Sequence, residues 1–345
     1  MTTPVPTTIT TSAESRSQKR GCLFYVRRTL KWFGIVLVAL IVAGIVYQTV
    51  ATELDKGTYT PRGQMYTVNG HQMHLVCLGE GSPTVILEGG ATAESLWWYW
   101  VQQQLAEHTQ VCAYDRAGLG WSEVANGSRD PLTIADDLHG LLHEAGVSGP
   151  YVVAGHSFGA VWARIFGAQY PQEVSGIVLV DSTVIPGASD YPSWKTFNDV
   201  VQSALWAMTR TGVLRLTVSS QFVSSGYPLE VANELSAQQA RNQTFDTTYA
   251  ETIATMPAFI EAAAHAENLG SLPIAILWAG AGPLGGEHLA EVRAAMAGYS
   301  SNSMTLIIAG ADHGSILGNE RYAQQVSDAI LDVIEAAETG EPLTE

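Results

Sequence analysis

Residues 155–159, with the sequence Gly-His-Ser-Phe-Gly, are the strongest sign of chemistry in this chain. They follow the apolar run Tyr151–Ala154 and open a segment, Phe158–Tyr170, with helical spacing. A serine between two glycines at a strand-to-helix junction forms a nucleophile elbow, in which a tight turn lifts the hydroxyl above the sheet. The free amides of the following helix then lie beside it. The pattern predicts that Ser157 is a nucleophile.

The segments around this motif must form the sheet and helices that position it. Apolar runs with the length of strands lie at Met65–Val68, Met73–Leu78, Thr84–Leu87, Val111–Tyr114, Tyr151–Ala154, Gly176–Val180, Ile274–Trp278 and Met304–Ile308. The first two flank Asn69-Gly70, a favoured two-residue hairpin turn. Helical segments separate most of the others. An antiparallel hairpin followed by strand-helix units predicts an α/β fold, with a mostly parallel sheet of about eight strands and helices on both faces.

One stretch breaks this alternation. Residues 184–271 contain helical patches and no convincing strand, which predicts a helical cap inserted between two strands of the sheet.

The order of these segments resembles the α/β-hydrolase fold superfamily over residues 64–338. Residues 114–122, Tyr-Asp-Arg-Ala-Gly-Leu-Gly-Trp-Ser, are similar to the loop after the fourth strand in capped members. Residues 170–181 are similar to the segment after the nucleophile helix. The resemblance implies a capped hydrolase in which Ser157 forms an acyl-enzyme intermediate.

A serine hydroxyl needs a base to remove its proton. Of the nine histidines, His313 lies in a glycine-flanked loop just past the last strand, where this superfamily keeps its catalytic histidine. The resemblance therefore implies that His313 is the base. His156 is adjacent to the nucleophile, and we expect its side chain to pack in the core beneath the elbow.

The acid that orients this histidine is less directly indicated. Many relatives carry it after the seventh strand, but the loop here, residues 278–284, has Pro283 and no carboxylate in the usual place. Asp181, at the tip of the sixth strand, occupies the position used by other members, and Glu287 is the alternative acid farther along the seventh-strand loop.

An acyl-transfer transition state also needs donors for its oxyanion. The resemblance implies the amides of Phe158, directly after the nucleophile, and of Gly90, in the sequence Glu88-Gly89-Gly90 after the third strand. Relatives often have histidine before this glycine pair, and Glu88 departs from that pattern. The aromatic run Leu96–Trp100 is read as core in preference to an acyl pocket.

The first 52 residues hold six of the 17 Lys and Arg residues but one of the 33 Asp and Glu residues. No residue from Trp32 to Thr52 is charged, and these 21 residues are enough for a helix to cross a bilayer. The charge distribution predicts a disordered, basic cytoplasmic tail at 1–31, a transmembrane helix at 32–52 and an extracytoplasmic hydrolase domain at 53–345. A cleaved signal peptide ending at residues 49–51 is the alternative.

The superfamily fold also makes the second and fourth strands neighbours. This adjacency could place Cys77 and Cys112 side by side. It leads to the hypothesis of a disulfide in an oxidising compartment and leaves two buried thiols open as the other state. Cys22 lies on the other side of the predicted span.

Cofactors and nucleic acid are not expected. Residues 53–345 carry 32 acidic and 11 basic side chains, which would repel a phosphate backbone. Residues 280–285 match G-x-G-x-x-G, but Pro283 lacks the amide that a phosphate would use and the match is too near the C-terminus for a dinucleotide fold. No Cys/His spacing is typical of a metal site.

These features predict a membrane-anchored serine hydrolase that cleaves a carboxylic ester or related acyl bond in a small molecule. An aminopeptidase or amidase, a lactonase and a thioesterase are the alternatives among enzymes. The serine argues against relatives with an aspartate nucleophile, such as dehalogenases and epoxide hydrolases. A non-catalytic cell-surface binding module is the alternative of another class.

Overall fold

The computed structural model describes residues 22–185, 190–281 and 287–344, in two compact units that comprise residues 1–43 and 44–345. Most of the predicted basic tail, residues 1–21, lies outside the described residues. The described part of the first unit is helical and belongs to α1 (Cys22–Thr58). Among the described residues, Leu23–Thr58 is the one segment long and apolar enough to cross a membrane. The helix continues six residues past the predicted end of the span at Thr52.

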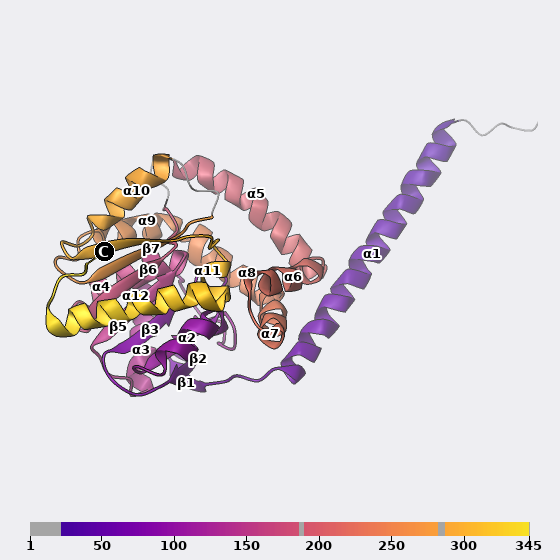
Figure 1. Cartoon of the computed structure of the whole chain (residues 1–345). Helices are drawn as coiled ribbons and strands as arrows, with labels where there is room; N and C mark the ends of the chain where they lie inside the picture. Colours follow the sequence, from indigo (N-terminus) through magenta and orange to yellow (C-terminus); the bar gives the residue numbers. More distant parts are fainter. Residues whose placement is uncertain (1–21, 186–189, 282–286, 345) are drawn as a thin grey trace, which may run out of the picture. The chain divides into compact units, whose positions relative to one another are not determined.

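The second unit contains an eight-stranded sheet in the order β1-β2-β4-β3-β5-β6-β7-β8 (Figure 1). Its strands are β1 (Gln64–Val68), β2 (His71–Leu78), β3 (Thr84–Glu88), β4 (Val111–Tyr114), β5 (Tyr151–His156), β6 (Val174–Val180), β7 (Ile274–Ala279) and β8 (Ser303–Ile308). β1 and β2 form the predicted hairpin, β2 pairs antiparallel with β4, and the remaining pairs are parallel. The predicted fold class is confirmed.

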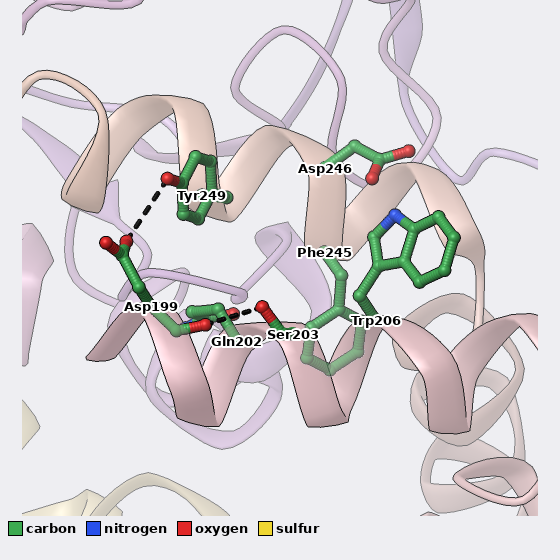
Figure 2. A pocket seen from close by; sticks show the side chains of 7 residues that line it. All are labelled: Asp199, Gln202, Ser203, Trp206, Phe245, Asp246 and Tyr249. Atoms are coloured by element: carbon green, nitrogen blue, oxygen red, sulfur yellow. Dashed lines mark hydrogen bonds between the residues drawn. The ribbon is translucent and has the colours of Figure 1, made fainter. Parts of the chain in front are cut away.

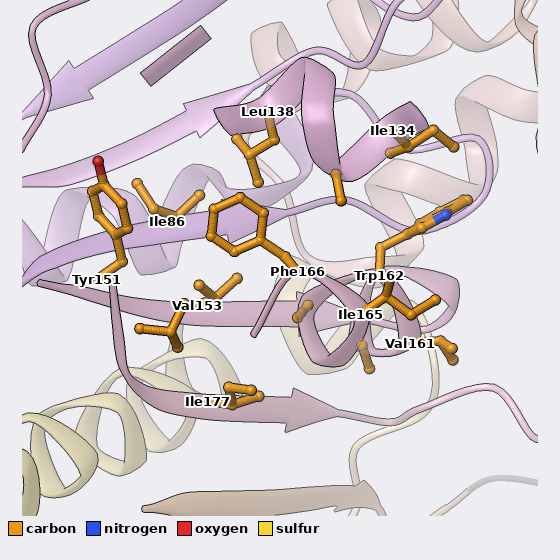
Figure 3. Packing of buried hydrophobic residues seen from close by; sticks show 14 of the residues in the cluster. Ile86, Ile134, Leu138, Tyr151, Val153, Val161, Trp162, Ile165, Phe166 and Ile177 are labelled. Atoms are coloured by element: carbon orange, nitrogen blue, oxygen red, sulfur yellow. The ribbon is translucent and has the colours of Figure 1, made fainter. Parts of the chain in front are cut away.

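Helices cover both faces of this sheet because its central strands are apolar on both sides. On β5, Val153 faces the cluster that includes Trp162 and Phe166 of α4 (Phe158–Gln169), as Figure 3 shows. Its neighbour Val152 faces the opposite cluster, which is built with α2 (Tyr99–Leu105) and α12 (Glu320–Thr339). The first cluster also includes α3 (Pro131–Glu144). The nucleophile strand is therefore fixed from both sides.

The start of α3 shows why the sequence places a helix there. Asp130 is its N-cap, and the carboxylate accepts hydrogen bonds from the amides of Leu132 and Thr133. Pro131 takes the first helical position, where no amide hydrogen is required. The helix therefore begins at Pro131.

Between β6 and β7 the described residues form helices and no strand. These are α5 (Tyr191–Arg210), α6 (Arg215–Ser225), α7 (Leu229–Gln239), α8 (Asn242–Thr248), the π-helix η2 (Tyr249–Ile253) and α9 (Met256–His265). A cavity of about 520 Å³ lies between α5 and the α8–η2 segment (Figure 2). It is lined by Asp199, Gln202, Ser203, Trp206, Phe245, Asp246 and Tyr249.

The predicted disulfide is confirmed. Cys77 of β2 and Cys112 of β4 are directly opposite in the antiparallel pair, and their sulfur atoms are bonded. Among the core predictions, Trp98 is fully buried as expected, in the short 3₁₀ helix η1 (Ser95–Trp98).

Candidate active site

Ser157 occupies the sharp turn between β5 and α4. Its backbone has φ 57° and ψ −123°, a left-handed conformation that is strained for a residue with a side chain. A Cβ at Gly155 would lie 2.2 Å from the carbonyl oxygen of Gly159, and one at Gly159 would lie 2.4 Å from that of Glu88. Both glycines are therefore required by close backbone contacts.

The structure brings Ser157, His313 and Asp181 together from three separate loops. His313 Nε2 lies 3.1 Å from Ser157 Oγ, and His313 Nδ1 lies 2.6 Å from Asp181 Oδ2. Because a carboxylate can only accept, Nδ1 carries the hydrogen and Nε2 is left to accept from the Ser157 hydroxyl. This tautomer is the one that a general base needs.

The loops that hold the two partners are themselves hydrogen-bonded. Asp312 accepts from the amides of Gly314 and Ser315, which fixes the turn carrying His313. Asp181 has φ 43°, and its Oδ1 accepts from the amide of Ala279 on β7. Burial disfavours the ionised carboxylate, but hydrogen bonds from His313 and Ala279 outweigh it and lower the pKa of Asp181 below its ordinary value.

Glu287, the alternative acid, is the first residue of α10 (Glu287–Ala297). Its side chain lies outside the described part of the chain, and so do the preceding residues 282–286, which include Pro283.

The two predicted oxyanion donors belong to segments on either side of Ser157. Phe158 is the first residue of α4, where backbone amides have no partner within the helix. A Cβ built on Gly90 would lie 3.2 Å from the Ser157 Cβ and 3.3 Å from the His156 carbonyl oxygen. The loop after β3 therefore passes next to the nucleophile, and glycine allows that approach.

The residue that holds this loop is Arg116, which the sequence motifs did not single out. Its guanidinium is fully buried and donates to the carbonyl oxygens of Gly89 and Gly90 at 2.6 Å each. It also donates to Glu88 Oε1 at 2.6 Å and to Glu251 Oε2 of η2 at 3.0 Å. One side chain thus ties the loop after β3 to η2.

This buried charge is balanced by carboxylates. Burial lowers the pKa of Arg116, but Glu251 and Glu88 outweigh it and raise the pKa above its ordinary value. Tyr114 donates a hydrogen bond to Glu88, and Arg129 donates to Glu251 at 2.9 Å. Glu88, which departs from the histidine of relatives, has a role here as the partner of Arg116.

His156 differs from its prediction. It is 2% exposed, but it packs against the candidate base in place of the core beneath the elbow. Its Nε2 donates to the His313 carbonyl oxygen at 3.0 Å, and the two rings lie 4.5 Å apart. Thr183, which sequence reasoning also missed, has its Oγ1 3.1 Å from Ser157 Oγ. His156 directly precedes Ser157, and Thr183 follows Asp181 by two residues. This nearness in sequence was the available signal.

The environment of His156 predicts an acid-sensitive step in stability. Burial, followed by the nearby charge of His313, lowers the pKa of His156 to about 3. In the unfolded chain the His156 ring takes up a proton as the pH falls below 6.5, whereas in the folded state it does so only near pH 3. The folded state therefore loses stability between pH 6.5 and 3. By pH 5 the loss is about 2 kcal/mol. His156→Gln keeps a hydrogen-bond donor for the His313 carbonyl oxygen. Between pH 7 and 5 its free energy of unfolding should fall by about 2 kcal/mol less than that of the parent.

Urea unfolding of the full chain in detergent at the two pH values measures this difference, because the other titrating groups cancel between the proteins. If the free energy of unfolding of the parent and of His156→Gln changed equally with pH, His156 would take up its proton in the folded state as readily as in the unfolded chain.

Among the described residues, no group of three or more His, Cys, Asp or Glu side chains is arranged to hold a metal ion. Most of the G-x-G-x-x-G match falls in 282–286, outside the described residues.

The family model of the alpha/beta hydrolase fold matches residues 83–319. The chain belongs to this family, and the predicted membership is confirmed. An uncharacterized protein of Schizosaccharomyces pombe is 31% identical over 164 residues, which is 39% of this chain and 31% of that protein. The match covers between 15% and 49% of the length of these curated relatives.

Solved structures agree with the fold. An epoxide hydrolase, CorEH, superimposes with a TM-score of 0.62 at 20% identity, covering 79% of this chain and 98% of that one. A thermophilic esterase from Thermogutta terrifontis superimposes with a TM-score of 0.57 at 21% identity, with the same coverage. The chain is thus similar in fold to hydrolases of different chemistry, and membership of the family indicates a hydrolase.

Proposed function

We propose that this hydrolase cleaves a carboxylic ester or a related acyl bond through an acyl-enzyme on Ser157. The observation that carries the proposal is the continuous hydrogen-bonded series from Ser157 through His313 to Asp181, at 3.1 and 2.6 Å. A serine at the elbow favours acyl transfer over the opening of an epoxide, because a serine adduct is an ether in that reaction and an ester in acyl transfer.

In this mechanism Ser157 Oγ attacks the carbonyl carbon while His313 Nε2 takes the hydroxyl proton. The carbonyl electrons move onto oxygen, where the amides of Phe158 and Gly90 stabilise the charge. The tetrahedral intermediate collapses, the bond to the leaving alcohol breaks, and His313 donates its proton to that alcohol. Water, activated by the same histidine, then releases the acid and restores Ser157.

The proposal also includes a single-pass membrane anchor with the N-terminus in the cytoplasm and the hydrolase domain outside it. The length and apolar character of Leu23–Thr58 support an anchor. Basic residues on its N-terminal side support the orientation. The Cys77–Cys112 disulfide fits an oxidising compartment for the hydrolase domain.

A substrate series tests the reaction. The full chain in detergent is assayed with p-nitrophenyl esters of increasing acyl length and, beside them, aminoacyl p-nitroanilides, with Ser157→Ala as the blank. We expect ester hydrolysis that the blank lacks. Turnover of anilides alone would make the enzyme an amidase, and turnover of no substrate in the series would reject an ester hydrolase.

A further inference from the structure

Helices α5 and α6 of the cap expose an apolar face, which we call the cap face. Its exposed members are Phe197, Val200, Ala204 and Ala207 on α5, Val213 in the following turn, and Leu216 and Val223 on α6. The α5 members recur at intervals of three or four residues and so share one side of the helix. Phe197, Val200 and Leu216 are 69%, 68% and 74% exposed. Exposed apolar side chains gathered on neighbouring helices in this way indicate a site of interaction.

The cap face carries no charge of its own. All four charged side chains of α5 and α6 have ion-pair partners at other positions: Lys195 with Asp199, Arg210 with Asp246, and Arg215 with Asp55. The surface is therefore suited to an apolar environment and not to a charged partner.

The second half of α1 packs against the same part of the cap. Within the unit that begins at Gly44, the buried Gln48 donates to the Ala240 carbonyl oxygen at 2.6 Å, and Arg215 donates to Gln48 Oε1 at 3.2 Å. A Cβ on Gly44 would lie 2.4 Å from the Thr211 carbonyl oxygen, so α1 contacts the α5–α6 turn backbone to backbone. Small residues and satisfied polar groups are typical of helix contacts inside a membrane.

These contacts fix the level of the cap relative to residues 44–52, the end of the predicted span that belongs to the same unit. Gly44 and Gln48 precede Thr52, the last residue of the span, by about 12 and 6 Å along the helix. Residues of the cap that touch them lie at the same level. If residues 32–52 cross the bilayer, the α5–α6 turn lies within the outer layer of that bilayer, and the cap face next to it contacts lipid.

The opposite side of α6 leads to the active site. Phe222 is 2% exposed and packs edge to face on Trp97, with ring centres 5.2 Å apart. Trp97 stacks on His156 at 6.4 Å, and His156 contacts His313. One helix thus separates the cap face from the candidate base.

We propose that the cap face docks in the interfacial layer of the bilayer that α1 spans, and that the enzyme draws its substrate, a lipid ester, from that layer. The docking rests on the anchor in the proposed function, and the choice of substrate rests on the proposed hydrolysis as well. No soluble partner is required for either.

Spin labels on the full chain test the docking. In a Cys22→Ala background, Val200→Cys and Leu216→Cys are labelled and reconstituted in phosphatidylcholine–phosphatidylglycerol vesicles. Leu132→Cys, on the 49% exposed side chain at the start of α3, is the matched control. Oxygen enters lipid and a polar nickel complex does not, so the oxygen-to-nickel accessibility ratio at the two cap positions should exceed the control on the order of tenfold.

Equal ratios at all three positions would overturn the docking, as would release of the full chain from these vesicles by alkaline extraction.

Charge placed on the cap face tests the supply of substrate. Leu216→Glu should lower hydrolysis of a diacylglycerol ester in these vesicles by about tenfold, because a carboxylate resists entry into the interface. Hydrolysis of soluble p-nitrophenyl butyrate should not change, and Leu132→Glu should affect neither substrate.

Equal loss on both substrates, or no loss on the vesicle substrate, would overturn the supply from lipid. If the parent hydrolyses neither ester while the labels report lipid, the proposed reaction fails and the docking stands.

Discussion

Ser157→Ala should abolish labelling of the chain by a fluorophosphonate and lower ester turnover by several orders of magnitude. The probe forms a covalent bond with a serine whose hydroxyl is deprotonated by a neighbouring base, and Ser157 Oγ lies 3.1 Å from His313 Nε2. Because the hydroxyl sits in an open turn and is replaced by hydrogen alone, the fold should be preserved. Gel fluorescence of the probe and initial rates with a p-nitrophenyl ester measure the two effects.

Ser175→Ala is a matched control, because Ser175 is also part-buried but donates its hydrogen bond to the Tyr151 carbonyl oxygen on the sheet. It should label and turn over like the parent. Labelling that persists in Ser157→Ala would place the reactive nucleophile at another residue. Absence of labelling in the parent would favour a binding module that lacks catalysis.

Asp181→Asn should lower turnover by about four orders of magnitude, as the loss of the acid does in serine-protease triads. The Asp181 Oδ1 accepts from the Ala279 amide while Oδ2 accepts from His313 Nδ1. In the variant, the side-chain oxygen of the new asparagine accepts the hydrogen bond from the Ala279 backbone amide. Its side-chain nitrogen then faces His313 Nδ1. His313 Nδ1 must accept, its hydrogen moves to Nε2, and the ring no longer takes the serine proton.

Glu287→Gln is the comparison that separates the two candidate acids. It should change turnover by less than about tenfold, since it leaves the tautomer of His313 unaltered. Circular dichroism of both variants checks that they are folded. If Glu287→Gln proves the more damaging, Glu287 is the acid and the contact of Asp181 with His313 only positions the loop.

Local sequence patterns were sufficient to predict the strands of the sheet. The alternation of apolar runs with helical segments defines the strands because each central strand is buried on both faces, as Val152 and Val153 are. Ser157 was predicted from its own motif, whereas Asp181 and His313 were implied by the resemblance to the superfamily. All three follow the carboxyl ends of parallel strands, β5, β6 and β8, which meet at one edge of the sheet.

Contacts between distant segments could not be predicted in the same way. Arg116 and Glu251 are 135 residues apart, and nothing local to either indicates that they will be buried together beside the loop after β3. The extension of α1 to Thr58 was missed because charged Glu53, Asp55 and Lys56 end the apolar run, whereas the helix continues with Asp55 paired to Arg215. The burial of Arg116 and the length of α1 both depend on residues that are distant in sequence, and the sequence near Arg116 or near Thr52 does not reveal those partners.

The ion pair between Arg116 and Glu251 limits how the cap can be exchanged. A chimera that carries the cap of another enzyme on this core is one example. Here such a graft removes Glu251 and leaves the buried Arg116 with Glu88 as its one remaining ion-pair partner among the described residues. The graft also takes one of two carboxylate partners from the buried Arg129, which keeps Asp137. Buried charges that lose a partner are costly. A chimera built on this core therefore needs an acid at the position of Glu251, together with replacements for other cap contacts, such as the hydrogen bond from Thr248 to the Ala91 carbonyl oxygen.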